Sequence, residues 1–283
     1  MDRRGFTLIE LIVAMILAAI VGVAIYQALT NSQRVYQMQA ERAAMNANTR
    51  TAVALLPMEL REMSTTDPVD SDVIEADSTY VEYKAMRGLF FLCLPPTGNV
   101  LAFWGSPRYG LDTTLTGGQD SVVIFSEGNP GSRADNAWIH AGVGSLAVSA
   151  SACPGPSAGT VVTVNNVTPA GGLSGVLAGA PVRSFEVVKV GTYTSGGSVW
   201  LGAQVHDGSS YGSIQPVLGP LAADGLQLVY YDKYGVATTD ETQVARVDLR
   251  IIGQTSRPVY NAGDLRLVVD TLITSIALRN NRR

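Results

Sequence analysis

Residues 6–25 read FTLIELIVAMILAAIVGVAI, an apolar run with one charged residue, Glu10. As an α-helix, a run of this length rises about 30 Å, which matches the hydrocarbon thickness of a bilayer. Arg3 and Arg4 precede the run, and basic residues favour the cytoplasmic side of a membrane. The sequence therefore predicts a helix that spans a membrane, with the residues after it outside the cytoplasm.

A cleaved secretory signal peptide is the alternative for the same residues. Signal peptides have an apolar region of about 7–15 residues, followed by a small-residue cleavage site. Residues 21–24, VGVA, would form only a weak site of that kind, and the apolar run is longer than a signal peptide needs. A helix that stays in the membrane is therefore favoured.

Glu10 is the feature of the apolar run that costs energy. An acidic side chain in a membrane helix costs about 2.5–3.5 kcal/mol at the bilayer centre, and less near an end. Glu10 lies one helical turn from Phe6, so a cut before Phe6 would place a new α-amino group near the carboxylate. The carboxylate would then pair with that amine or with the amine of a neighbouring chain. A tolerated charge at the membrane edge is the plainer alternative.

Residues 4–10, RGFTLIE, with the apolar run behind them, resemble the signature of type IV prepilins and type II secretion pseudopilins. This resemblance implies that a prepilin peptidase cuts between Gly5 and Phe6 and that Phe6 is N-methylated. It also implies that Glu10 neutralises the amine of an adjacent subunit during filament assembly. The protein would then be a structural subunit and not an enzyme, held in the inner membrane until it joins other pilins.

Ala14, Ala18 and Gly22 recur every four residues along the same helix. Small side chains at this spacing allow helix backbones to approach closely in a bundle. The spacing therefore predicts a helix-packing face, although the ordinary composition of membrane helices explains the pattern equally well.

The helical pattern continues beyond the membrane through residues 28–64, which are rich in good helix formers. Their apolar residues fall at steps of three, four or seven, which makes one amphipathic stripe. We expect a single helix from Phe6 to Met63, about 85 Å long. Pro57 should bend it or disturb its last turns, and Thr65–Pro68 should stop it.

Strand patterns follow residue 68, in short runs of β-branched and aromatic residues that Gly and Pro separate. Residues 246–251 alternate strictly between polar and apolar side chains, as in a half-buried strand. Strands without intervening helices favour an antiparallel sheet, so the predicted fold class is α+β, a long N-terminal helix packed on a β-sheet domain. The expected strands are 79–86, 89–94, 100–104, 121–125, 160–164, 185–190, 199–205, 226–231, 246–251 and 265–278, the last as one long strand or two joined ones.

The chain thus divides into a cleaved leader (1–5), a membrane and filament-core helix (6–27), the amphipathic continuation of that helix (28–64) and an extracytoplasmic β-rich domain (65–283). Within the last, residues 136–182 contain no Asp, Glu, Lys or Arg and are rich in Gly, Ser, Pro and Ala. We expect this region to consist of long loops with one or two strands.

The two cysteines, Cys93 and Cys153, would lie outside the cytoplasm in this topology. An oxidising envelope permits a disulfide between them that closes a loop of about sixty residues. A buried free thiol at Cys93, inside an apolar run, is the alternative.

Composition and motifs exclude several classes of function. The net charge is −4, and no cluster of Lys and Arg is present for direct nucleic-acid binding. His206–Asp207 lacks a nucleophile in a recognisable context, and Asp224, Asp232 and Asp240 are too far apart for a calcium loop and should sit in turns. We therefore expect no metal and no cofactor.

The C-terminal half carries a second resemblance. Residues 224–232 (DGLQLVYYD), the alternating strand at 244–251 and residues 276–280 (IALRN) are similar to PilW-type minor pilins and to J-type pseudopilins of type II secretion. The resemblance implies a minor pilin that primes or caps a type IV pilus, or else a J-type pseudopilin. A membrane-anchored envelope adhesin or enzyme is the alternative from another class.

Overall fold

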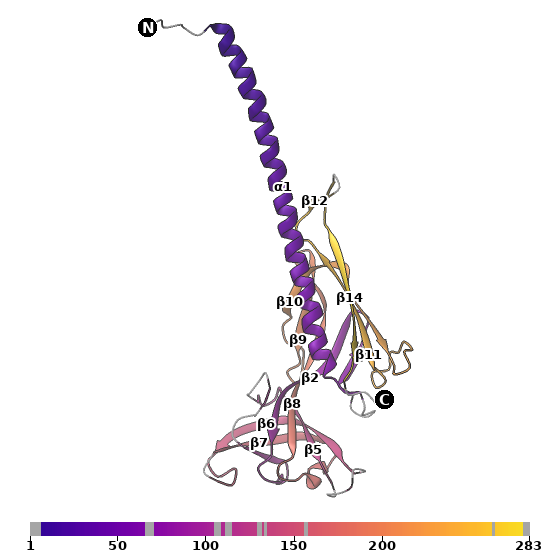
Figure 1. Ribbon diagram of the computed structural model, residues 1–283. Coiled ribbons are helices and arrows are strands. Elements are labelled where there is room, and N and C mark those ends of the chain that lie inside the picture. Colours follow the sequence, from indigo (N-terminus) through magenta and orange to yellow (C-terminus); the bar gives the residue numbers. More distant parts are fainter. Residues whose placement is uncertain are drawn as a thin grey trace.

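The computed structural model describes residues 7–65, 71–104, 109–110, 115–128, 132, 135–155, 158–261 and 264–279. A single helix, α1 (Leu8–Arg61), leads into an antiparallel β-sheet domain. The first half of α1 projects away from the domain and the second half lies along it (Figure 1). The predicted α+β fold is confirmed.

Helix α1 contains 54 residues and is therefore about 81 Å long. A capping box at Thr7 and Glu10 starts the helix by satisfying backbone N–H groups that have no partner within it. Pro57 lies inside the helix, buried against the sheet, and the helix continues to Arg61. Proline lacks the backbone N–H that would donate a helical hydrogen bond. Burial of this turn on the domain offsets the free-energy cost of that lost bond. At the other end, the backbone N–H of Arg279 donates to the carbonyl of Arg61 at 3.0 Å.

The strands form one large antiparallel sheet and a separate two-stranded hairpin, β12–β13. The order along the main sheet is β14-β11-β10-β9-β8-β5-β6-β7-β3, while β2 pairs with β1, β4 and β8. The elements are β1 (Val73–Ala76), β2 (Tyr80–Phe91), β3 (Val100–Trp104), β4 (Tyr109–Gly110), β5 (Ser121–Ser126), β6 (Ala137–Ser149), β7 (Gly159–Thr168), the 3₁₀ helix η1 (Gly172–Gly175), β8 (Pro181–Ser195), β9 (Ser198–Val205), β10 (Gln215–Tyr231), β11 (Arg246–Gln254), β12 (Val259–Asn261), β13 (Asp264–Arg266) and β14 (Val269–Ala277).

Several expected strands are parts of longer ones. The runs at 79–86 and 89–94 belong to the single strand β2, because a register shift opposite β8 between Met86 and Gly88 lets the strand continue. The expected strand at 265–278 is two, β13 and β14. The alternating run at 246–251 lies in β11, whose register with β14 is regular from Arg246 to Gln254.

The β domain has two hydrophobic cores. The first lies beneath α1 and includes Leu60, Leu228 and Leu249. The second lies beyond the C-terminal end of the helix, among β3, β5, β6 and β7 (Figure 1), and includes Phe103 and Ile124. Strands β2 and β8 run through both and tie them together.

Residues 136–182 contain two strands, β6 and β7, and the expected strand at 160–164 lies within β7. Both strands are long, so the region has more strand than its composition suggests. Apolar side chains along these strands, among them Ile139 and Val162, lie in the second core, while many other residues of the region are exposed and uncharged. Some of its glycines allow neighbouring strands to lie close together. A Cβ at Gly142 in β6, for example, would lie 2.3 Å from Oδ1 of Asn165 in β7. Such glycines resemble loop residues in composition, although they belong to strands.

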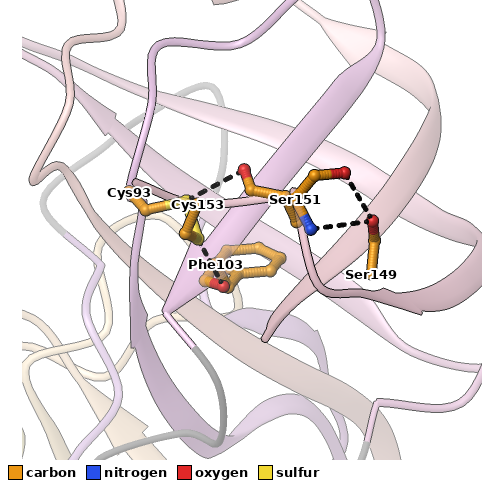
Figure 2. Close-up of a disulfide and its surroundings, with 6 residues drawn as sticks. Cys93, Phe103, Ser149, Ser151 and Cys153 are labelled. Carbon is orange, nitrogen blue, oxygen red and sulfur yellow. Dashed lines mark hydrogen bonds between the residues drawn. A yellow bond between two sulfur atoms is a disulfide. The ribbon is translucent and has the colours of Figure 1, made fainter. Parts of the chain in front are cut away.

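Cys93 and Cys153 form a disulfide with their Cα atoms 5.5 Å apart (Figure 2). The bond ties the segment after β2 to the β6–β7 connection, and both residues are buried at the edge of the second core. Sγ of Cys153 lies 3.0 Å from the carbonyl oxygen of Phe103 in β3. The disulfide therefore holds three segments of the second core together.

We expect a Cys93→Ser/Cys153→Ser variant to lose stability mainly in the second core. Opening a cross-link that spans 60 residues costs about 4 kcal/mol in the chain-entropy model. Hydrogen exchange should show faster opening of β3, β6 and β7, while β10 and β11 beneath α1 keep their protection. Equal protection of β6 in both proteins would contradict this expectation.

Candidate functional site

The N-terminal half of α1 contacts nothing else in the described part of the chain. Every residue from 7 to 29 is exposed, including Leu8 at 78% and Leu29 at 58%. The most apolar 18-residue window of the helix has a mean hydropathy of 2.9 and is not buried at all. An apolar surface this long is unstable in water, so this segment requires a membrane or other helices around it.

Glu10 lies near the exposed tip of the helix, at the end farthest from the β domain (Figure 1). Its Oε2 accepts hydrogen bonds from the backbone N–H of Thr7 and from Oγ1 of Thr7, each at 3.0 Å. Within the described residues no cation lies within ion-pair distance of the carboxylate. Gly5 and Phe6, the residues of the expected cleavage site, lie outside the described residues.

Ala14, Ala18 and Gly22 are exposed on the same free segment. A Cβ added at Gly22 would meet no atom within 4 Å. The stripe of small residues is thus open toward whatever surrounds the helix.

The second half of α1 is packed on the first core. Met45, Thr49, Ala52, Leu56 and Leu60 are buried, against β10, β11 and β14.

The helix packs tightly on the sheet at Gly253 in β11. A Cβ there would lie 2.3 Å from Cγ2 of Thr49 and 3.3 Å from Cγ of Met45. Any larger residue would push the helix away from the sheet.

Polar contacts fix the direction of the helix relative to the domain. Nδ2 of Asn48 donates to the carbonyl of Gly219 at 2.8 Å, and Oε2 of Glu41 accepts from the backbone N–H of Ser256 at 3.0 Å. Glu41 and Asn48 lie two turns apart on the same face of the helix, and their contacts reach the segment before β12 and β10. The exposed half of α1 is therefore held as a stiff extension of the domain.

Arg87 joins the end of α1 to both cores. It lies at the register shift of β2 and contacts Glu59 of the helix at 3.2 Å and Glu186 of β8 at 2.9 Å. Since each of the three side chains is at most about one-third exposed, these ion pairs are less screened than surface pairs.

Asp72 lies where the chain turns from α1 into β1. Its Oδ2 accepts a hydrogen bond from the backbone N–H of Ser64 at 2.6 Å, and the carboxyl is almost fully buried at 7% exposure. Burial raises the pKa of Asp72 to about 6, against the lowering effects of the Ser64 hydrogen bond and of the charges on His140 and Arg183. The native protein therefore binds a proton here that the unfolded chain releases.

We expect the free energy of unfolding to fall as the pH rises from about 4 to about 6. In that range native Asp72 keeps its proton while the unfolded carboxyl has lost it, so raising the pH favours the unfolded state, by up to about 3 kcal/mol. Asp72→Asn should flatten this dependence, since an amide oxygen still accepts from Ser64. Denaturant titrations of both proteins in detergent at several pH values test this, and identical pH slopes would refute it.

His206 and Asp207, which the sequence places side by side, lie at a turn. Oδ1 of Asp207 accepts from the backbone N–H groups of Ser209 and Ser210, and these bonds, led by Ser210, lower its pKa to about 2. His206 accepts from the backbone of Gly208 through Nδ1. Asp207 thus orients the turn and not the imidazole, and the pair makes no catalytic dyad.

A search of the described residues for three or more His, Cys, Asp or Glu side chains able to hold one metal ion finds no such group. Asp232 and Asp240 cap their own turns, through the backbone N–H groups of Tyr234 and Thr242.

One feature was missed by the sequence reasoning, a hollow of about 220 Å³ between α1 and the β12–β13 hairpin. Arg34 and Arg257 both line it. Arg34 is the first charged residue after Glu10. The end of the uncharged run could therefore have indicated that Arg34 lies at the membrane boundary.

Comparison with known proteins identifies the N-terminal segment. Residues 1–26 match the family model described as the prokaryotic N-terminal methylation motif, the class III signal peptide of type IV prepilin-like proteins. No curated protein and no solved structure matches the chain. The motif supports a pilin-like or pseudopilin protein, and together with the exposed apolar helix it suggests a single-pass anchor in the inner membrane.

Proposed function

We propose that this chain, which carries the class III signal peptide of a type IV prepilin-like protein, is a minor pilin that primes or caps a type IV pilus. The observation that carries the proposal is the match at residues 1–26, which continues into the apolar first half of α1, where residues 7–29 are all exposed. In this role a prepilin peptidase removes residues 1–5 and Phe6 becomes the methylated N-terminus.

Glu10 selects the register of assembly. Its carboxylate lies one turn from the new amine, and within the described residues only Thr7 donates hydrogen bonds to it. Moving the helix from lipid into a filament core gains little hydrophobic energy, because lipid is equally apolar. An ion pair between Glu10 and the amine of an adjacent subunit supplies the preference, since an unpaired charge in an apolar medium is costly.

Close packing of helices supplies the rest of the affinity. The open stripe of Ala14, Ala18 and Gly22 lets a neighbouring helix approach without a side chain between the backbones. The stiff connection of α1 to the β domain then sets where that domain lies on the filament surface.

This function is structural and needs no enzymatic activity, cofactor, metal or nucleic acid. The β domain lies outside the cytoplasm, first at the membrane and then on the filament. The runner-up within the class is the J-type component of a type II secretion pseudopilus, which shares the same helix.

The mass of the mature protein from its native envelope tests the proposal. We expect a chain that begins at Phe6 and carries one additional methyl group. An intact Met1, or a start near Ala24, would contradict processing as a pilin and would favour the anchored adhesin or enzyme.

Deletion of the gene separates the two filaments. Loss of surface pili with normal protein secretion supports the minor pilin, whereas normal pili with loss of secretion supports the pseudopilin. Restoration by the intact gene is the control for both outcomes.

A further inference from the structure

The hollow between α1 and the β12–β13 hairpin has a cationic and aromatic lining. Arg34 and Tyr36 come from the helix, and Arg257, Tyr260 and Leu265 come from the hairpin and the segment before it. The guanidinium of Arg34 lies 4.6 Å from the centre of the Tyr260 ring, so the hairpin is held beside the helix at this level.

The position of the hollow along α1 matches the outer surface of the membrane. Residues 11–33 contain no charged side chain, and Arg34 lies roughly 36 Å along the axis from Glu10. The hydrocarbon core is about 30 Å thick, and the headgroup regions bring the total to about 40–45 Å. With Glu10 near the cytoplasmic boundary, Arg34 and the hairpin lie among the headgroups of the opposite leaflet.

The two cations in the hollow are not neutralised by the protein. In the described part of the chain neither Arg34 nor Arg257 has a carboxylate within ion-pair distance. The one acidic residue of the lining, Glu41, bonds to the backbone N–H of Ser256. Two guanidinium groups that line a small hollow and have no carboxylate within ion-pair distance are suited to bind a phosphate group.

Leu265 and Tyr260 form an apolar rim of the hollow at the height of the lipid headgroups. Leu265 is 64% exposed and Tyr260 is 44% exposed. Tyrosine is enriched at membrane interfaces, where its ring lies at headgroup depth. Asp264 and Arg266 both lie in β13, so the hairpin carries charges of both signs. Outside the hollow, Nη2 of Arg42 donates to Oδ1 of Asn261 in β12 at 3.2 Å.

We propose that this hollow binds the phosphate headgroup of an anionic phospholipid in the outer leaflet of the membrane that holds the helix. Arg34 and Arg257 bind the phosphate, and Leu265 and Tyr260 contact the glycerol and acyl boundary. The contact fixes the height and rotation of the β domain before assembly. This lipid-binding proposal rests on the proposed function in one respect: the helix must span the membrane with Arg3 and Arg4 on the cytoplasmic side.

Fluorescence quenching in lipid nanodiscs tests the contact with the full chain. A probe is attached at Leu265→Cys, since Cys93 and Cys153 are joined to each other, and a headgroup spin-labelled lipid serves as quencher. The discs contain phosphatidylcholine alone or mixed with phosphatidylglycerol. We expect quenching about twofold stronger in the anionic discs, falling toward the neutral value at high salt.

Three variants separate specific binding from general charge and from misfolding. Arg34→Gln/Arg257→Gln should reduce quenching in anionic discs to the value in neutral discs. Arg34→Lys/Arg257→Lys keeps the charges and should retain most of the difference. Lys233→Gln/Arg250→Gln removes two exposed cations elsewhere on the domain and should change nothing.

Equal quenching in the two kinds of disc would overturn the inference, as would an equal loss in the Lys233→Gln/Arg250→Gln control. The discs contain single chains, so filament assembly does not enter the measurement. A chain that binds anionic headgroups but is never built into a filament overturns the proposed function and leaves this inference standing.

Discussion

Replacement of Glu10 by Leu is expected to abolish filament assembly without lowering the amount of protein in the membrane. The carboxylate makes insertion harder, by about 2.5–3.5 kcal/mol at the bilayer centre and less near an end, so its removal does not weaken anchoring. In the filament, however, the amine of a neighbouring subunit loses its partner and is left charged in an apolar core. Electron microscopy of pili, or a secretion assay, compared with the quantity of membrane-bound protein measures the two effects separately.

Two further variants separate the charge of Glu10 from its role as a helix cap. Glu10→Gln keeps a side chain that can complete the capping box with Thr7 but removes the charge, and it should fail as Glu10→Leu does. Thr7→Ala removes the cap and keeps the charge, and it should assemble. Glu62→Gln changes an exposed carboxylate just after the helix and serves as the control. Normal filaments with Glu10→Leu would overturn the pilin function and favour an anchored adhesin or enzyme.

Gly253→Ala is expected to destabilise the docking of α1 on the sheet by about 1–3 kcal/mol. The new Cβ would lie 2.3 Å from Cγ2 of Thr49. The β-branched Thr49 side chain cannot rotate freely in a helix, and its Oγ1 donates to the carbonyl of Met45 at 2.9 Å. The backbone of α1 or of β11 must therefore move. Thermal unfolding of the detergent-solubilised protein measures the loss.

Thr49→Ala in the same chain should restore most of the lost stability, because it removes the methyl group that the new Cβ meets. Gly212→Ala is the matched control, since its Cβ would lie at an ordinary contact distance of 3.4 Å from the Val205 carbonyl oxygen. A Gly253→Ala protein as stable as the parent, or a double variant no better than the single one, would show that the helix does not rest on β11 at this point.

Features that depend on residues close together in the chain could be predicted before the structure was known. The apolar run, Glu10 within it and the basic leader predict the membrane helix and its cleavage motif without any knowledge of the domain, and the motif match at residues 1–26 agrees. The strict alternation at 246–251 likewise predicts a strand, because successive side chains of a strand face opposite sides of a sheet. Pro57, which is expected to bend the helix or disturb its last turns, does not end it, since α1 continues to Arg61.

Only the tertiary structure decided how distant segments meet. Residues 136–182 look like loops because Gly, Ser and Ala dominate them, yet Ile139 and Val162 lie in a second core that also includes residues of β2, β3 and β5, outside the region. The contact of Gly253 with Thr49 and the hollow between Arg34 and Arg257 each join residues separated by some two hundred positions. No periodicity within one segment encodes such contacts, because the energy that favours them exists only after the sheet has formed and the helix has packed on it.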